Sequence, residues 1–162
     1  MRIGILSDTH SRYDAVRSAL SSLRKRRIHL VLHCGDIEDA ETVRLFEGFE
    51  THFVLGNCDW DKTGLQRAIE EIRGTLHDHF GHLELKGRKI SWIHGDNQPL
   101  FRDIDNSGAY DFLFYGHSHI AEQHRSGPTL VVNPGALHRA KRKSFAILEL
   151  RRGEIETVLV DP

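Results

Sequence analysis

The sequence predicts an α/β protein in which two β-sheets pack against each other. Three observations lead to this fold class. Short apolar runs rich in Val, Ile, Leu and Phe recur along the chain, as expected of buried strands. The first three runs alternate with stretches of helical periodicity, which is typical of right-handed β-α-β units and a parallel sheet. From residue 82 onward strand-like runs predominate, which predicts a second, mostly antiparallel sheet packed on the first.

The first half of the chain is expected to alternate between strands and helices. The predicted order is a strand over residues 3–6, a helix over 16–23, a strand over 30–33, a helix over 40–49, a strand over 53–55 and a helix over 65–72. The apolar face of the first helix follows the spacing i, i+3, i+4, i+7 and consists of Val16, Ala19, Leu20 and Leu23. Asp39 precedes the second helix and can act as its N-cap.

The second half is expected to contain mainly strands. The predicted elements are a hairpin of residues 82–85 and 89–93, a short helix over 99–105, and strands over 112–115, 130–132, 144–150 and 155–160. The turns that support these strands are Lys86-Gly87 and Arg152-Gly153. Because no linker, repeat or low-complexity segment interrupts the chain, we expect residues 1–162 to form a single domain.

Composition limits the functional classes. The chain has 162 residues, of which 39% are hydrophobic and 28% charged, as in ordinary globular proteins. The net charge of -1 offers no general attraction to nucleic acid or to a membrane surface, so neither is an expected partner. No apolar stretch approaches the ~18 residues of a membrane span. The two cysteines do not make a disulfide framework, and the first strand leaves no room for a signal peptide, so we expect a cytoplasmic location.

Five of the apolar runs end in residues of the types that bind metal ions. In open α/β sheets the ligand crevice lies outside the carboxyl ends of the strands, so these groups are expected to converge. They contribute two Asp, one Asn and four His, namely Asp8, His10, Asp36, Asn57, His94, His117 and His119, with Cys58 and Asp59 close by. Such a set suits two divalent ions and makes hydrolysis the leading interpretation.

Two of the groups share a one-residue gap. Residues i and i+2 at a strand end point the same way, so Asp8 and His10 can reach one ion, and His117 and His119 can do the same. An N-capping Asp beside a surface His remains an alternative for the first group. The glycine and the apolar strand before His117 favour ligation in the second group.

The remaining groups are weak evidence when taken singly. Gly35-Asp36 is also an ordinary turn, a lone His94 at a strand end is often only a surface residue, and Asn57 follows Gly56 as it would in a local turn. A carboxylate such as Asp36 is nonetheless what a dinuclear centre requires between its ions, because its charge offsets their repulsion. The combination of five strand-end groups therefore indicates a shared metal site.

Taken in order, these motifs resemble those of the calcineurin-like metallophosphoesterases. The motifs are Asp-x-His at 8–10, Gly-Asp at 35–36, Gly-Asn-x-Asp at 56–59, His-Gly at 94–95 and Gly-His-x-His at 116–119. The short chain and the turn Asn133-Pro134-Gly135 before the strand at 145–150 look like the compact, single-domain bacterial and archaeal phosphodiesterase branch. The resemblance implies a four-layer αββα sandwich, with two mixed β-sheets flanked by helices.

The resemblance also implies roles for the seven residues. Asp8, His10 and His119 would bind one metal, Asn57, His94 and His117 the other, and Asp36 would bridge them. The implied cofactors are two divalent transition-metal ions, with manganese favoured and iron, nickel, cobalt or zinc also suited to the His, Asp and Asn donors. A hydroxide held between such ions would attack a phosphate ester.

The implied function is that of a metal-dependent phosphodiesterase acting on a small phosphate ester, with nucleotide-like compounds as candidates. One alternative is a phosphomonoesterase or phosphatase of the same family. Leu55 stands before Gly56-Asn57 where resembling protein phosphatases have an arginine that grips phosphate, and this difference favours diesters. A second alternative is a non-catalytic scaffold, since a retromer subunit resembles this fold. The oligomeric state is not predicted.

The chain departs from the family pattern at Cys58. Many members have a histidine there that protonates the leaving oxygen, with the following Asp orienting it. Three interpretations stay open: Cys58 donates the proton with Asp59 beside it, leaving-group assistance is weak, or Cys58 only packs while Asp59 caps a turn. Arg12 is a candidate substrate contact, because a guanidinium can bind phosphate bidentately, although a solvent-facing helix start explains it as well.

Overall fold

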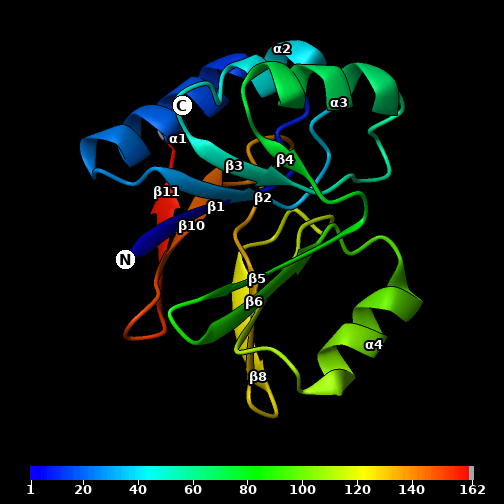
Figure 1. The fold of residues 1–162 in the computed structure, drawn as a ribbon. Helices are drawn as coiled ribbons and strands as arrows, with labels where there is room; N and C mark the ends of the chain where they lie inside the picture. Colours follow the sequence, from blue (N-terminus) through cyan, green and yellow to red (C-terminus); the bar gives the residue numbers. More distant parts are fainter. Residues whose placement is uncertain (161–162) are drawn as a thin grey trace.

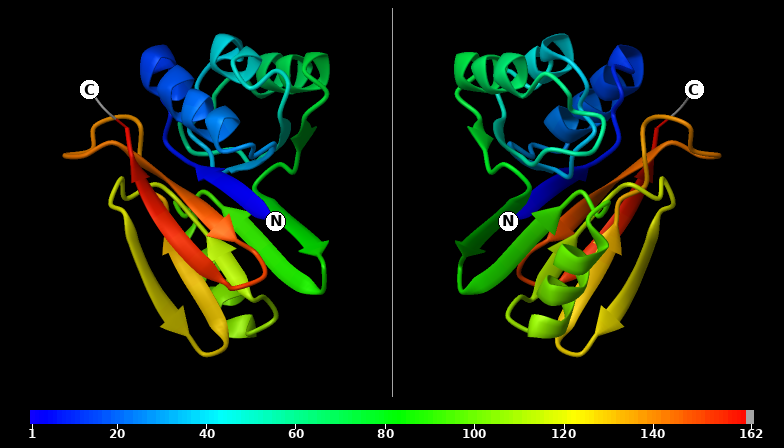
Figure 2. Two further views of the ribbon diagram at one scale, coloured as in Figure 1. Left: turned by 90° about the vertical axis from the view of Figure 1, so that its left-hand side faces the viewer. Right: turned by 90° about the vertical axis from the view of Figure 1, so that its right-hand side faces the viewer.

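The computed structural model describes residues 1–160 and has four layers in the order helix, sheet, sheet, helix (Figure 1). The views at right angles show helices of the first half of the chain above one sheet and the helix Gln98–Ser107 beyond the other (Figure 2). Both sheets contain parallel and antiparallel pairs. The expected αββα sandwich of two mixed sheets is therefore confirmed.

In the first sheet four adjacent strands pair in parallel, and two further strands are added through antiparallel pairs. Its strands are β1 (Arg2–Leu6), β2 (Leu30–His33), β3 (Glu50–Phe53), β4 (Thr75–Leu76), β10 (Ser144–Glu149) and β11 (Glu154–Leu159). They are arranged in the order β11-β10-β1-β2-β3-β4. The expectation that the last strands belong to the second sheet is wrong, because β10 pairs antiparallel with β1, placing Ile3 opposite Leu148.

The second sheet has the order β5-β6-β7-β9-β8. Its strands are β5 (Phe80–Leu85), β6 (Arg88–Ile93), β7 (Phe112–Phe114), β8 (Glu122–Ser126) and β9 (Thr129–Asn133). The predicted hairpin is confirmed as β5 and β6, which pair antiparallel. The prediction of a mostly antiparallel sheet is wrong, because β7 pairs parallel with both β6 and β9. The parallel pair of β6 and β7 requires a crossover connection, and the helix between these two strands provides it.

Within residues 1–160, four helices cover the sheets. They are α1 (Tyr13–Lys25), α2 (Ala40–Arg44), α3 (Lys62–Glu71) and α4 (Gln98–Ser107). Asp39 is the N-cap of α2, as predicted, and its carboxylate accepts the Thr42 N–H at 2.8 Å. The second helix is shorter than expected, because the chain turns after Arg44 and the apolar Phe46 and Phe49 enter the core from turns.

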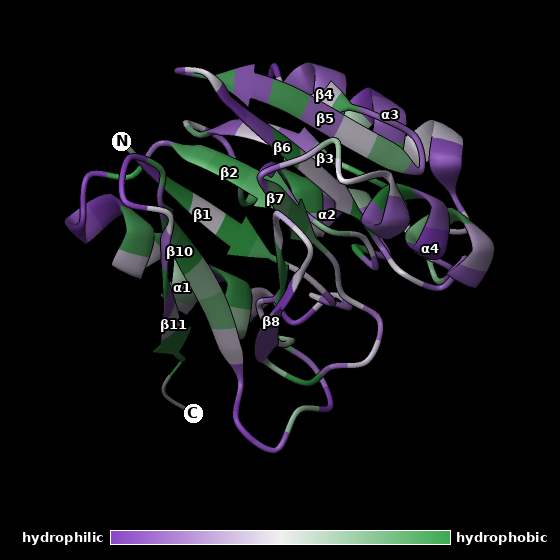
Figure 3. Ribbon diagram, turned by 90° about the horizontal axis from the view of Figure 1, so that it is seen from below, coloured by the Kyte–Doolittle hydropathy of each residue, from purple (hydrophilic) through white to green (hydrophobic). Residues whose placement is uncertain are grey.

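Three apolar layers hold the sandwich together. One core joins α1, α2 and α3 to the first sheet, a second lies between the sheets, and a third joins α4 to the second sheet. Figure 3 shows β2 as mainly hydrophobic and β8 as hydrophilic, in agreement with a central and an edge strand. Among residues 1–160, no helix combines the length and apolar character that crossing a bilayer requires.

Candidate metal centre

The five predicted groups lie together at the carboxyl ends of β1, β2, β3, β6 and β7. Backbone hydrogen bonds tie their loops to one another: the Asp8 N–H donates to the Gly35 oxygen at 3.0 Å, and the Gly116 N–H to the His94 oxygen at 2.8 Å. Donor atoms of ligands from different groups lie as close as 3.0 to 3.3 Å to one another. The structure thus brings all seven predicted metal ligands to one place.

The ligands gather through left-handed backbone rather than through strand alternation. Strand β1 ends at Leu6 and β7 at Phe114, so both pairs with a one-residue gap lie in loops. The φ angles are positive at five ligands, namely Asp8 (52°), His10 (41°), Asp36 (58°), His117 (67°) and His119 (59°). Only a few per cent of non-glycine residues adopt such angles, which concentrate at functional sites. The predicted i, i+2 geometry is therefore wrong in its mechanism, although the residues do converge.

Two glycines let the loops approach this closely. A Cβ atom on Gly56 would lie 2.1 Å from Asp36 Oδ1, and one on Gly116 would lie 1.9 Å from Ser7 Oγ and 2.6 Å from Asp8 Oδ2. Real Cβ contacts are essentially never this short, so any side chain at these positions would push a carboxylate away. The glycines that precede Asn57 and His117 are thus part of the site's geometry.

The first donor set consists of Asp8, His10 and His119. The Nε2 atoms of His119 and His10 lie 3.1 Å and 3.9 Å from Asp8 Oδ1. Asp8 Oδ1 and His10 Nε2 are buried and have no hydrogen-bond partner among residues 1–160. Buried polar atoms are rarely left unpaired, so these orphaned atoms indicate a position for a cation. A carboxylate with two imidazoles fits a divalent transition metal.

The second donor set consists of Asn57, His94 and His117. Asn57 Oδ1 lies 3.0 Å from His94 Nε2 and 3.1 Å from His117 Nδ1. His117 also donates its backbone N–H to Asp8 Oδ2 at 3.1 Å, so the two sets are connected. His117 and His119 therefore face different partners, whereas their spacing alone suggested a shared ion.

Asp36 lies between the two sets. Its Oδ2 is 3.3 Å from Nε2 of both His10 and His94, while its Oδ1 accepts the Cys58 N–H at 2.9 Å. Burial raises the pKa of Asp36, but the hydrogen bond and charge of His94 outweigh it and lower that pKa to about 2. Burial likewise lowers the pKa of His94, but Asp36 outweighs it and raises that pKa to about 9. A carboxylate is thus maintained at the junction of the two sets.

Outer hydrogen bonds orient the histidines. His10 donates from Nδ1 to Glu38 Oε1 at 2.7 Å, and His94 donates from Nδ1 to the Cys34 oxygen at 2.9 Å. This leaves Nε2 of each ring facing the centre, as in metal sites where an outer acceptor fixes the tautomer. Glu38 was not predicted as part of the site. In the sequence, only its position two residues after Asp36 could have indicated this role.

Asn133 is a second residue that was not recognised as part of the site. Its amide donates to the Gly116 oxygen at 2.9 Å and to Ser118 Oγ at 3.0 Å. These bonds hold the loop that carries His117 and His119. In the sequence, Asn133 is marked only by the turn Asn133-Pro134-Gly135, which resembles a feature of the family and does not by itself indicate contact with the site.

Cys58 and Asp59 have different surroundings. The Cys58 sulfur lies within 4.8 Å of donor atoms of His10 and Asp36, and burial together with the Asp36 charge raises the pKa of the thiol to about 11. Asp59 is buried, and its two oxygens accept four backbone N–H groups at 2.7 to 3.0 Å, those of Asp36, Ile37, Glu38 and Gly56. Burial raises the pKa of Asp59 although these bonds oppose the shift. The contacts of Asp59 are those of a loop cap.

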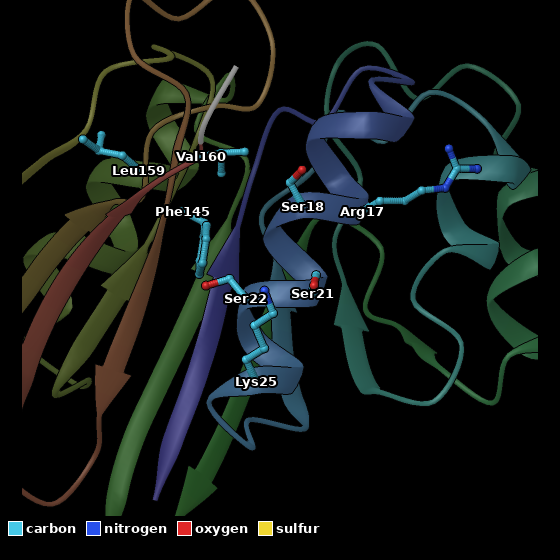
Figure 4. Close-up of a pocket in the computed structure, with 8 residues that line it drawn as sticks. All are labelled: Arg17, Ser18, Ser21, Ser22, Lys25, Phe145, Leu159 and Val160. Atoms are coloured by element: carbon cyan, nitrogen blue, oxygen red, sulfur yellow. The ribbon is translucent and has the colours of Figure 1, made fainter.

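Arg12 lies at the border of the centre. Its Nε donates to His138 Nδ1 at 2.9 Å, and the His138 ring lies 4.9 Å from that of His10, centroid to centroid. A separate cavity of about 540 Å³ opens between α1 and the strands β10 and β11, where none of the predicted ligands lies (Figure 4). The chemistry-bearing residues therefore gather at the strand ends and not in that cavity.

The chain matches a known protein family over most of its length. A family model described as the calcineurin-like phosphoesterase superfamily domain matches residues 1–153. The chain belongs to this superfamily. The resemblance in the motifs is thus confirmed, and with it the expected class of enzyme, a hydrolase of phosphoester bonds.

Individual superfamily members match the chain over most of its length. Phosphodiesterase MJ0936 of Methanocaldococcus jannaschii is 30% identical over 138 residues, which cover 83% of each chain. A solved structure of an archaeal phosphodiesterase has a TM-score of 0.91 at 27% identity and covers 98% of this chain and 99% of its own. Vps29 of Entamoeba histolytica, solved with Zn²⁺, shares the fold at 20% identity, with a TM-score of 0.70 over 99% of this chain and 100% of its own.

Proposed function

We propose that this protein is a metal-dependent phosphodiesterase that hydrolyses a small phosphate ester through a dinuclear metal centre and a bridging hydroxide. One observation carries the proposal above all. Asp36 Oδ2 lies at the same distance, 3.3 Å, from one imidazole of each donor set. A carboxylate in that position is suited to bridge two cations. The names of the relatives support the choice of phosphodiester as substrate.

The proposed ligands divide into two sets that share one residue. Asp8, His10 and His119 would hold the first ion, Asn57, His94 and His117 the second, and Asp36 both. We favour manganese, and the mixed nitrogen and oxygen donors also suit iron, nickel, cobalt or zinc. When bound, two such ions lower the pKa of a shared water and offset charge that develops on the phosphoryl oxygens.

The charges of the ligands favour an anionic substrate. Asp8 and Asp36 contribute two negative charges, whereas Asn57 and the four histidines contribute none in their ligating forms. The loaded centre would keep a net positive charge, which attracts a phosphodiester and stabilises its transition state. The neutral amide of Asn57 thus serves the reaction by not adding a further negative charge.

Metal-dependent diesterase activity is the direct test. With Mn²⁺ present, we expect hydrolysis of bis(4-nitrophenyl) phosphate, with kcat/KM at least ~10-fold above that of 4-nitrophenyl phosphate, or about 1.4 kcal/mol of preference. Treatment with EDTA should abolish the release of nitrophenol, and added Mn²⁺ should restore it. Preference for the monoester would support the phosphomonoesterase. Release from neither compound with any of the five metals would support the non-catalytic scaffold. Metal binding alone does not separate these alternatives, because binding an ion does not require turnover.

We propose that Cys58 donates a proton to the leaving group and that Asp59 supports it from the adjacent position. The thiol is close to the Asp36 carboxylate, and its raised pKa keeps it protonated but makes it a reluctant donor. Weak assistance to the leaving group, or packing alone, remains the competing interpretation of Cys58. The bonds of Asp59 to four N–H groups favour a capping role for that residue.

Replacing Cys58 with His separates these alternatives. An imidazole with an ordinary pKa near ~6.5 is the better donor, so Cys58→His should raise kcat for diesters with poor alkyl leaving groups. For nitrophenyl leaving groups, which need little protonation, the gain should be small. Metal content measured by mass spectrometry should match that of the wild type. Unchanged kcat on the alkyl diesters would argue against a donor at this position.

The remaining expectations follow from the same proposal. We propose a single metallophosphoesterase domain over residues 1–162, which the family match over residues 1–153 supports. The cytoplasmic location stays a prediction, and the two unpaired cysteines, Cys34 and Cys58, are in keeping with it. Nucleotide-like diesters are the first candidates for the natural substrate.

A further inference from the structure

Arg12 and His138 form a pair that the seven proposed ligands do not include. They are 126 residues apart in the chain, and Arg12 Nε donates to His138 Nδ1 at 2.9 Å. A guanidinium can only donate, so Nδ1 is the acceptor and the proton of a neutral imidazole ring lies on Nε2. The contact uses one nitrogen of Arg12 and leaves its two terminal nitrogens as a fork.

The pair lies beside the first donor set. The ring of His138 is 4.9 Å from that of His10 and 6.5 Å from that of His119, centroid to centroid. Arg12 itself follows His10 by two residues and is exposed. A substrate whose phosphate lies at the centre would therefore have Arg12 close to one of its substituents.

A hollow opens next to Arg12, on the outside of the pair. Its volume is about 280 Å³, and its lining consists of Ser11, Arg12, Tyr13, Asp14, Ala15 and Lys143. The only acidic group in this lining, Asp14, is fully exposed and lies 3.4 Å from Arg17 on the same helix. Two cations, Arg12 and Lys143, thus face a space large enough for a phosphate group.

We propose that Arg12, held by His138, and Lys143 form a second anion-binding subsite. The preferred substrate is then a phosphodiester that carries a further phosphate on the group attached to the scissile phosphorus. The two terminal nitrogens of Arg12 match two oxygens of a phosphate, and Lys143 adds a point charge. This inference rests on the proposed function, because it names the substrate class of the same site.

His138 is a positioning residue in this proposal. A free arginine side chain loses much rotamer freedom when it binds an anion, and the bond to Nδ1 restricts that freedom beforehand. His138 therefore acts through Arg12, and its effect should appear in KM for the phosphorylated substrate. A residue with a merely structural role would instead change activity on all substrates alike.

Two matched dinucleotides test the subsite in the Mn²⁺-loaded full chain. One carries a 5′-terminal phosphate and the other lacks it, and the measured quantity is the ratio of their kcat/KM values. We expect the wild type to prefer the phosphorylated dinucleotide by at least ~10-fold, a typical gain for a charged hydrogen-bonded contact. Arg12→Gln and Lys143→Gln should move the ratio towards one. Arg67→Gln is the control, since Arg67 is an exposed arginine of α3, away from the lining of the hollow, and should keep the wild-type ratio.

Variants of His138 test its positioning role. His138→Ala should reduce the ratio mainly through KM for the phosphorylated dinucleotide. His138→Asn places an amide oxygen near the position of Nδ1, where it can accept from Arg12 Nε, so it should restore much of the preference. The double variant Arg12→Gln/His138→Ala should be no worse than Arg12→Gln, because both changes remove the same contact.

The outcomes separate this inference from the proposed function. If the wild type hydrolyses neither dinucleotide nor bis(4-nitrophenyl) phosphate, the proposed function itself fails. If it hydrolyses both dinucleotides with equal kcat/KM, the diesterase stands and the subsite is excluded. An Arg67→Gln effect as large as that of Arg12→Gln would show only a general effect of charge and would also overturn the subsite.

Discussion

Asp36→Asn should lower kcat on bis(4-nitrophenyl) phosphate by at least ~1,000-fold, equivalent to about 4 kcal/mol of transition-state stabilisation. The reason is the position of Oδ2 between His10 and His94. An amide at this place has one oxygen and no charge, so it cannot offset the repulsion of two cations. The bound metal, measured by mass spectrometry after gel filtration, should fall below that of the wild type.

Two further variants show whether the loss is specific to the centre. Asp103→Asn makes the same chemical change at an exposed position of α4 and should leave kcat and metal content unchanged. His117→Ala removes a ligand of the second set and should abolish activity as Asp36→Asn does. Wild-type rates in either ligand variant, with metal fully supplied, would show that the centre has been assigned to the wrong residues.

Asp59→Ala should destabilise the protein more than any other single truncation in these loops. The substitution leaves four N–H groups, three of them in buried hydrogen bonds of 2.7 to 3.0 Å to the carboxylate, without their acceptor. Buried donors without partners are costly, so we expect the free energy of unfolding to fall by about 3 kcal/mol. Activity should fall too, because three of the donors belong to residues 36–38, which carry Asp36. Urea unfolding of the metal-free protein measures the first effect.

A matched control lies two residues further on. Asp61 caps α3 by accepting the Gly64 N–H at 2.9 Å, and its removal in Asp61→Ala should cost about 1 kcal/mol. Asp59→Asn distinguishes a cap from a residue that orients a proton donor. If Asp59 is a cap, Asp59→Asn should lower the free energy of unfolding and should change kcat by similar factors for esters with good and with poor leaving groups. If Asp59→Asn kept wild-type stability and slowed only esters with poor leaving groups, the catalytic role would be correct and the capping role wrong.

Local patterns in the sequence predicted most elements but not their pairing. The spacing of the apolar residues predicted α1, the hairpin of β5 and β6 and the central strands, because burial of one face imposes that spacing directly. Strands β10 and β11 were predicted as strands and placed in the wrong sheet, since nothing local records that β10 pairs with β1. Strand β8 was missed because it is an exposed edge strand with the polar sequence EQHRS.

The site shows the same division between residue type and spatial arrangement. The seven proposed ligands could be listed because each follows an apolar strand and has side-chain chemistry that binds metals. The left-handed φ angles of five of them could not be predicted, because the neighbouring loops impose that conformation. The contacts of Glu38 with His10 and of His138 with Arg12 were not predicted, because the sequence does not reveal those distances.

The ligands come from both sheets, and this gives the centre a mechanical role. His94 donates to the Cys34 oxygen, and the His117 N–H donates to Asp8 Oδ2, so side chains of one sheet are bound to the loops of the other. Ions held by both donor sets would cross-link the halves of the sandwich, and by mass action their binding energy would add to the resistance of the fold against heat. Starved of transition metals, a cell would then hold a hydrolase that is both inactive and more readily degraded.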